Sequence, residues 1–254
     1  MKRVLTVTLT AGLALSFPWV SFAEEKQSNA SQATVSQAKP ELAIKPILYV
    51  PPKKGAPAPG LKRGGGTRGM NKSVPVISVL APDHVGLTLL EQPVLFWFAP
   101  TKQNLSYEFT LIAETAESPA VEVKLPQPSQ PGIQQIKLSD YNVKLSQGER
   151  YQWSVSVIMD PEEPSANIVA KGVIERIDRN KLEQPLPNGL SKADAPKRYA
   201  EAGLWYDAVM AFSDQIQSDP GNVDLRQQRA SLLEQGGLGE VAMSMLNMRT
   251  PSAY

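Results

Sequence analysis

Residues 150–158, Arg-Tyr-Gln-Trp-Ser-Val-Ser-Val-Ile, carry large apolar side chains at every second position. The apolar row consists of Tyr151, Trp153, Val155 and Val157. Successive side chains of a strand point to opposite faces, so this stretch predicts a strand with one buried and one solvated face. Residues 107–114, Tyr-Glu-Phe-Thr-Leu-Ile-Ala-Glu, repeat the pattern. We therefore expect antiparallel strands that cover a common core.

Further runs rich in Val, Ile, Phe, Tyr and Trp flank this stretch, and turn residues bound them. The candidate strands are 74–80, 94–99, 107–114, 121–125, 133–138, 150–158 and 168–177. About seven strands within about 100 residues predict an all-β sandwich, which we assign to residues 73–180.

One motif narrows this prediction. Leu145-x-x-Gly148-x-x-Tyr151-x-Trp153 resembles the start of strand F in fibronectin type III domains, where a Tyr hydroxyl bonds back to the upstream backbone. Trp97 lies where such domains place a core Trp on an early strand. The resemblance implies an immunoglobulin- or fibronectin-like sandwich and says nothing about a ligand.

A helical period replaces the strand pattern after a Pro-rich stretch, so residues 181–254 are expected to form a small α-helical C-terminal region. The apolar positions are Tyr199, Leu204, Ala208, Val209, Phe212 and Ile216. Asp219-Pro-Gly-Asn222 should end this helix and cap the next, and two further helices should surround residues 225–233 and 241–246.

An internal repeat is visible in this region. Gly203 and Gly237 are separated by the tetratricopeptide period of about 34 residues, as are Leu204 and Leu238, and Ala208 and Ala242. Only about one and a half units fit, fewer than the roughly three that a free-standing array needs. The helices should therefore pack on the sandwich.

Trp205 and Tyr206 are neighbours on a predicted helix, so their side chains point about 100° apart. We expect them to anchor the helices on the sandwich. In the alternative, one of the two rings faces outward and forms an interaction surface.

The first residues have the features of a targeting sequence. Lys2 and Arg3 precede an apolar run of about 14 residues, too short to span a bilayer, and Ser21-Phe22-Ala23 has the small-x-small pattern of a cleavage site. We expect residues 1–23 to be a signal peptide that is removed after Ala23. No Cys follows the run, so no lipid anchor is expected, and the mature protein should be periplasmic or secreted without a transmembrane anchor.

Residues 24–72 are expected to form a disordered tether and a basic, Pro/Gly-rich arm. The possible binding arm consists of Lys53, Lys54, Lys62, Arg63 and Arg68, because no acidic residue lies between Glu41 and Asp83. Such an arm could contact an anionic envelope polymer or lipid. A phosphate loop at Gly64-Gly65-Gly66 is disfavoured, because no strand precedes it and no helix follows it.

The composition of the chain excludes several kinds of catalytic and metal-binding site. The chain has no Cys and a single His, His84, so thiolate catalysis, zinc-thiolate sites and iron–sulfur clusters are excluded. No G-x-S-x-G motif accompanies His84, and the acidic turn Asp160–Glu163 lacks the pattern of a calcium loop. The near-neutral charge of +1 gives no preference for nucleic acid. We therefore assign no catalytic, cofactor-binding or metal-binding residue.

Six segments distributed along the chain carry a resemblance to a known family. They are Gly64-Gly65-Gly66-Thr67-Arg68-Gly69, Phe96-Trp97-Phe98, Tyr151-x-Trp153, Asp160-Pro161, Gly172-x-Ile174-Glu175-Arg176 and Gly203-Leu204-Trp205-Tyr206-Asp207-Ala208. In these segments, which run in family order over roughly residues 55–245, the chain resembles the bacterial family called domain of unknown function 928. The resemblance implies an exported protein and supplies no catalytic residue.

These observations favour an exported, non-enzymatic periplasmic interaction or accessory module that binds an envelope protein or anionic polymer. One alternative is a hydrolase that acts on envelope glycans through carboxylates. The other is a structural adaptor at the outer membrane.

Overall fold

The computed structural model describes residues 47–53, 63–64 and 76–248. All of them belong to one compact unit, Ile44–Tyr254. The predicted signal peptide, residues 1–23, and most of the predicted tether lie outside the described residues. Among the residues described, none of the helices combines the length and the apolar character needed to cross a membrane.

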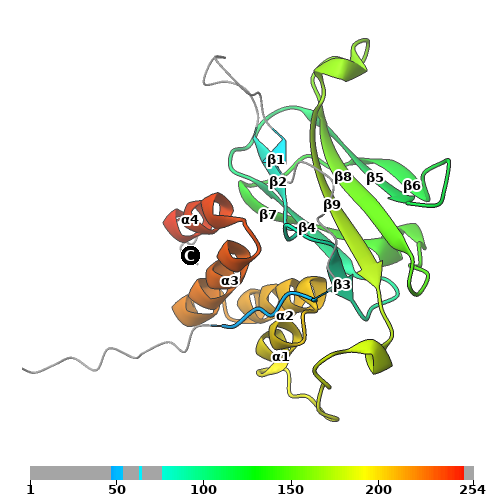
Figure 1. The fold of residues 1–254 in the computed structure, drawn as a ribbon. Coiled ribbons are helices and arrows are strands. Elements are labelled where there is room, and N and C mark those ends of the chain that lie inside the picture. Colours follow the sequence, from blue (N-terminus) through cyan, green and yellow to red (C-terminus); the bar gives the residue numbers. More distant parts are fainter. Residues whose placement is uncertain (1–46, 54–62, 65–75, 249–254) are drawn as a thin grey trace, which may run out of the picture. The chain divides into compact units, whose positions relative to one another are not determined.

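Two β-sheets form the larger part of the fold (Figure 1). The four-stranded sheet, in the order β1-β2-β4-β7, contains β1 (Arg63–Gly64), β2 (Ile77–Val79), β4 (Val94–Ala99) and β7 (Gly132–Lys137). The five-stranded sheet, in the order β3-β9-β8-β5-β6, contains β3 (Gly86–Thr88), β9 (Ile168–Arg176), β8 (Arg150–Ile158), β5 (Ser106–Ala113) and β6 (Val121–Leu125). All pairings are antiparallel except that of β3 with β9.

The alternating rows read from the sequence form the core between these sheets. Phe109 of β5 lies opposite Val155 of β8, and both are fully buried. Across the core, the rings of Trp97 and Tyr107 lie 5.1 Å apart and join β4 to β5. The arrangement is sandwich-like, and each of the seven predicted strand segments is confirmed as a strand. Two short strands, β3 and β1, were not predicted from the sequence.

The C-terminal region is helical, as the period indicated, and forms four α-helices in the part of the chain that the structure describes, two of them where a single helix was expected over residues 199–216 (Figure 1). They are α1 (Ala195–Glu201), α2 (Trp205–Ser218), α3 (Val223–Gln235) and α4 (Gly239–Asn247). The expected cap is confirmed, since the Asn222 side chain accepts a hydrogen bond from the Leu225 amide at 3.1 Å. Short 3-10 turns lie at Leu138–Tyr141, Pro164–Ala166 and Arg179–Lys181.

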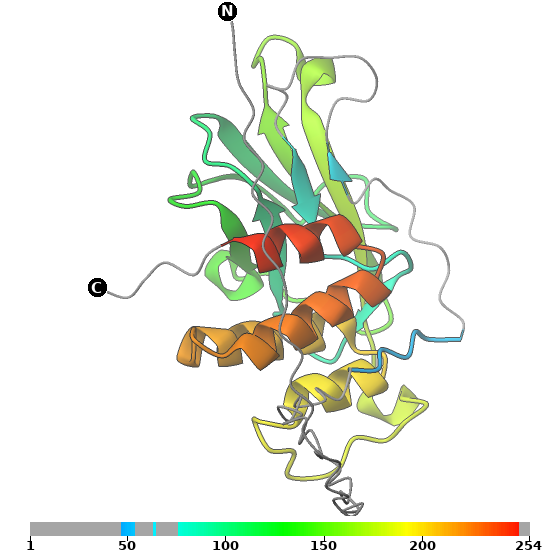
Figure 2. The same ribbon diagram turned by 90° about the vertical axis from the view of Figure 1, so that its left-hand side faces the viewer.

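The repeat positions Gly203 and Gly237 end α1 and α3 with the same turn. Both glycines have a positive φ, 77° and 79°, which L side chains rarely adopt. In each turn the following Leu amide reaches back to the carbonyl five residues earlier, Tyr199 or Leu233, as in a Schellman motif. The helices therefore form two pairs, α1–α2 and α3–α4, stacked in chain order (Figure 2).

Residues 47–53 differ from the disordered tether expected there. Ile47 and Tyr49 are buried, and the Val50 amide donates to the Ala200 carbonyl at 3.1 Å. The alternation of apolar residues over Ile47-Leu-Tyr-Val50 explains this, because it allows an extended segment to bury one face. Arg63 and Gly64 also differ, since they pair with β2.

Candidate functional site

The helices join the sandwich through the first turn of α2, which carries Trp205, Tyr206 and Asp207. The indole N–H of Trp205 donates to the Leu80 carbonyl at 2.8 Å, in the segment that follows β2. Its ring lies against Gly236, which leaves no room for a larger residue at that position. Trp205 is 0% exposed and Tyr206 is 2% exposed, so neither ring faces outward. The alternative, in which one ring faces outward, is therefore wrong, because both rings pack inside the fold.

The Tyr206 hydroxyl connects α2 to the centre of the five-stranded sheet. It donates to the Val173 carbonyl at 3.0 Å and accepts from the Trp153 indole N–H at 2.9 Å. Burial raises the pKa of Tyr206 above its usual value of 10.0, so the hydroxyl stays protonated. Gly86 of β3 makes room for this ring, since a Cβ there would lie 2.5 Å from Tyr206 Cε2.

Asp207 is a buried acid that the sequence analysis did not single out. Its carboxylate oxygens accept from the Leu89 amide at 3.4 and 3.3 Å, and its side chain is 2% exposed. Burial raises the pKa of Asp207 from 3.8 to about 7, although hydrogen bonds from Thr88 and Leu89 oppose the shift. An Asp in the first turn of a helix usually faces solvent, so the burial of Asp207 has no signal in the sequence.

His84 belongs to an aromatic cluster with Tyr49 and Trp205. Its Nδ1 lies 2.8 Å from the Val85 carbonyl, which can only accept, so Nδ1 donates this bond, and its Nε2 lies 3.0 Å from the Tyr49 hydroxyl. The Tyr49 ring is stacked on His84 at 5.7 Å and meets Trp205 edge-on at 5.1 Å. The single histidine is therefore engaged in packing, at the boundary between strands and helices.

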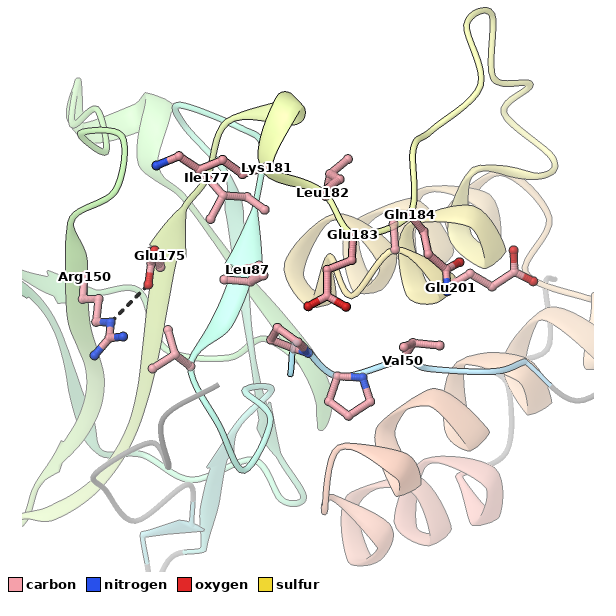
Figure 3. Close-up of a pocket in the computed structure, with 14 residues that line it drawn as sticks. Val50, Leu87, Arg150, Glu175, Ile177, Lys181, Leu182, Glu183, Gln184 and Glu201 are labelled. Carbon is pink, nitrogen blue, oxygen red and sulfur yellow. Dashed lines mark hydrogen bonds and ion pairs between the residues drawn. The ribbon is translucent and has the colours of Figure 1, made fainter. Parts of the chain in front are cut away.

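A cleft of about 270 Å³ opens beside this junction (Figure 3). One wall comes from β3, β8 and β9, the opposite wall from residues 181–184 and the end of α1, and residues 50–52 complete it. Its apolar lining consists of Val50, Pro51, Pro52, Val85, Leu87, Ile177, Leu182 and Ala202. Its polar lining consists of Arg150, Glu175, Lys181, Glu183, Gln184 and Glu201.

The carboxylates of the cleft are neutralised by cations. Arg150 Nε lies 3.1 Å from Glu175, and Lys53 lies 3.1 Å from Glu183. Glu201 is paired with basic residues of its own helix, among them Arg198 at 3.0 Å. No group of three or more His, Cys, Asp or Glu side chains within residues 47–53, 63–64 and 76–248 could hold a metal ion. The cleft is therefore apolar with a charge-balanced rim.

The predicted binding arm does not form one basic surface over the part of the chain that the structure describes. Lys53 pairs with Glu183, as noted, and Arg63 pairs with Glu240 of α4. Both basic residues are thus balanced by acids that the sequence places more than a hundred positions away. Lys54, Lys62 and Arg68 lie outside the described residues.

Comparison with known protein families identifies a match over most of the chain. A family model described as Domain of Unknown Function (DUF928) matches residues 63–246. The match begins at β1 and ends within α4, so it includes both sheets and the junction. No curated protein matches the chain.

Proposed function

We propose, from the premise that the chain belongs to the DUF928 family, that it is a non-enzymatic interaction module of the bacterial envelope. Its cleft would bind a short apolar segment of an envelope protein. The observation that carries this proposal is the pairing of apolar walls with carboxylates that cations already neutralise. Small binding sites are mostly apolar with a few polar groups that fix orientation, and this cleft has that composition.

The charge balance favours binding over catalysis. A glycan hydrolase needs one carboxyl group that stays protonated and a second that stays ionised beside it. In the cleft, Glu175 and Glu183 are each engaged in an ion pair with a basic side chain. The hydrolase alternative therefore has less support than a binding role. The outer-membrane adaptor depends on arm residues outside the described ranges.

Export remains part of the proposal. It is supported by the targeting pattern of residues 1–23, which predicts cleavage after Ala23 and a periplasmic or secreted location. The absence of Cys suits a core that packs without disulfides.

We also propose that the sandwich is immunoglobulin- or fibronectin-like and that the helices are tetratricopeptide-like. The order β2-β4-β7 beside β9-β8-β5 matches the A-B-E and G-F-C strand orders of immunoglobulin-like sandwiches. The Tyr151 hydroxyl accepts from the Ser146 amide at 3.0 Å, which supports a tyrosine corner. The repeated Gly-Leu turn supports a tetratricopeptide-like origin for the helix pairs.

Photo-crosslinking in living cells tests the cleft. A photoreactive residue at Leu182, which lines the cleft, should capture a specific partner that mass spectrometry identifies. The control position is Ser165, an exposed residue at the far end of the β8–β9 hairpin. Leu87→Asp, which places a charge on the cleft wall, should abolish the product. The same product from both positions, or none from Leu182, would contradict the proposal.

A further inference from the structure

Residues 47–52 are held by the helices as an extended peptide. The side-chain amide of Gln235 binds this segment twice, since Oε1 accepts from the Tyr49 amide and Nε2 donates to the Ile47 carbonyl, each at 2.9 Å. The Val50 amide adds a third bond, to the Ala200 carbonyl at 3.1 Å. The main chain of the segment is thus hydrogen-bonded by groups of α1 and α3.

Side chains of the segment alternate between buried and exposed. Ile47 and Tyr49 are 4% and 5% exposed, whereas Leu48 between them is 59% exposed. Tyr49 enters the aromatic cluster with Trp205 and His84, where its hydroxyl is hydrogen-bonded to His84 Nε2. Ile47 and Tyr49, two positions apart, therefore both insert into the fold, and the side chain between them does not.

A glycine makes room for the backbone at the end of this contact. A Cβ at Gly203 would lie 2.9 Å from the Val50 carbonyl oxygen, closer than a Cβ normally approaches. The surface formed by Ala200, Gly203, Trp205, Gln235 and His84 is called the peptide groove below. Pro51 and Pro52 leave this groove and line the cleft.

Main-chain hydrogen bonds with pockets for alternate side chains are the means by which proteins recognise extended peptides. We propose that the peptide groove is a binding site for extended peptides with apolar residues two positions apart followed by proline, and that residues 47–52 are its intramolecular ligand. None of the contacts described requires that the peptide belong to the same chain. This inference does not depend on what the cleft binds.

The test supplies the segment as a separate molecule. The full chain carries Ile47→Ser and Tyr49→Ser, which weaken its own segment. A fluorescent peptide with the sequence of residues 46–53 is added, and anisotropy measures binding. A tethered ligand competes at roughly millimolar effective concentration, so the wild-type chain should bind the peptide at least about tenfold more weakly than the variant.

Three matched controls define the site. A peptide with Leu48→Ser should bind as well as the original, because Leu48 is exposed. A peptide with Tyr49→Ser should not bind detectably. Gln235→Ala in the variant chain should weaken binding by about tenfold or more, because two hydrogen bonds are lost.

The variant's melting temperature provides a second measurement if the variant proves unstable. The original peptide should raise this temperature, and the Tyr49→Ser peptide should leave it unchanged. Equal affinity for wild type and variant would overturn the proposal, because the peptide would then bind elsewhere. A variant that neither binds the original peptide nor is stabilised by it would also overturn it.

Discussion

Replacing Tyr206 by Phe tests whether the hydroxyl network secures α2 to the sandwich. The substitution removes one oxygen and leaves no large cavity. It leaves the Trp153 indole N–H without its acceptor and takes one donor from the Val173 carbonyl, both in the interior. An unsatisfied buried group costs about 1–3 kcal/mol, so we expect the free energy of unfolding to fall by about 3 kcal/mol.

Urea unfolding followed by tryptophan fluorescence measures this loss, because Trp97, Trp153 and Trp205 are all buried. With a denaturant slope of about 3 kcal/mol per molar, the midpoint should fall by about 1 M urea. Tyr199→Phe is the control. Its half-buried hydroxyl makes no hydrogen bond with the other residues that the structure describes, so its midpoint should change by less than about 0.2 M.

The hydroxyl network would not be what secures α2 if Tyr206→Phe shifted the midpoint no more than Tyr199→Phe does. Packing of the Tyr206 ring alone would then account for the attachment of α2, and the hydroxyl would contribute nothing to stability.

Two further predictions concern the same junction. The pKa of Asp207 in the folded state, about 7, lies above its usual 3.8, so the native state binds this proton more tightly than the unfolded state does. The free energy of unfolding should therefore fall by at most about 4 kcal/mol as pH rises from about 4 to about 7. Asp207→Asn should flatten this pH dependence, which thermal melts across the same pH range would measure. Gly236→Ala should destabilise by about 1–3 kcal/mol in chemical unfolding, because its Cβ would overlap the Trp205 ring. Gly239→Ala, whose Cβ would meet nothing within 4 Å, should be neutral or slightly stabilising, and equal effects of the two changes would contradict the packing argument.

The strands were predictable because their local pattern and their environment agree. Residues 94–99, 121–125 and 150–158 match β4, β6 and β8 residue for residue. β3 was missed for a physical reason: it is three residues long, too short to show alternation, and its partner β9 lies more than eighty residues away. Parallel pairing of this kind leaves no hairpin signal in the sequence.

The candidate site was much less predictable. Its cleft is built from residues 50–52, 85, 87, 150, 175, 177, 181–184 and 201–202, which only the tertiary fold brings together. Trp205 and Tyr206 were recognised as anchors because large aromatic residues at adjacent helical positions seldom both face solvent. Asp207 could not be distinguished from an ordinary exposed residue of a first helical turn. The period-two signal of Ile47–Val50 was present, but the neighbouring polar and Pro-rich composition concealed it.

Atoms of helix α2 complete the core of the sandwich. The indole N–H of Trp153 and the carbonyl of Leu80 find their partners only on α2, and Gly86 is shaped around a ring of that helix. The β-sandwich therefore depends on α2 and should not be transferred to another protein without it. A fragment that ends near residue 190 would leave these buried polar groups without their partners on α2, so engineering of this protein should keep residues 47–247 together.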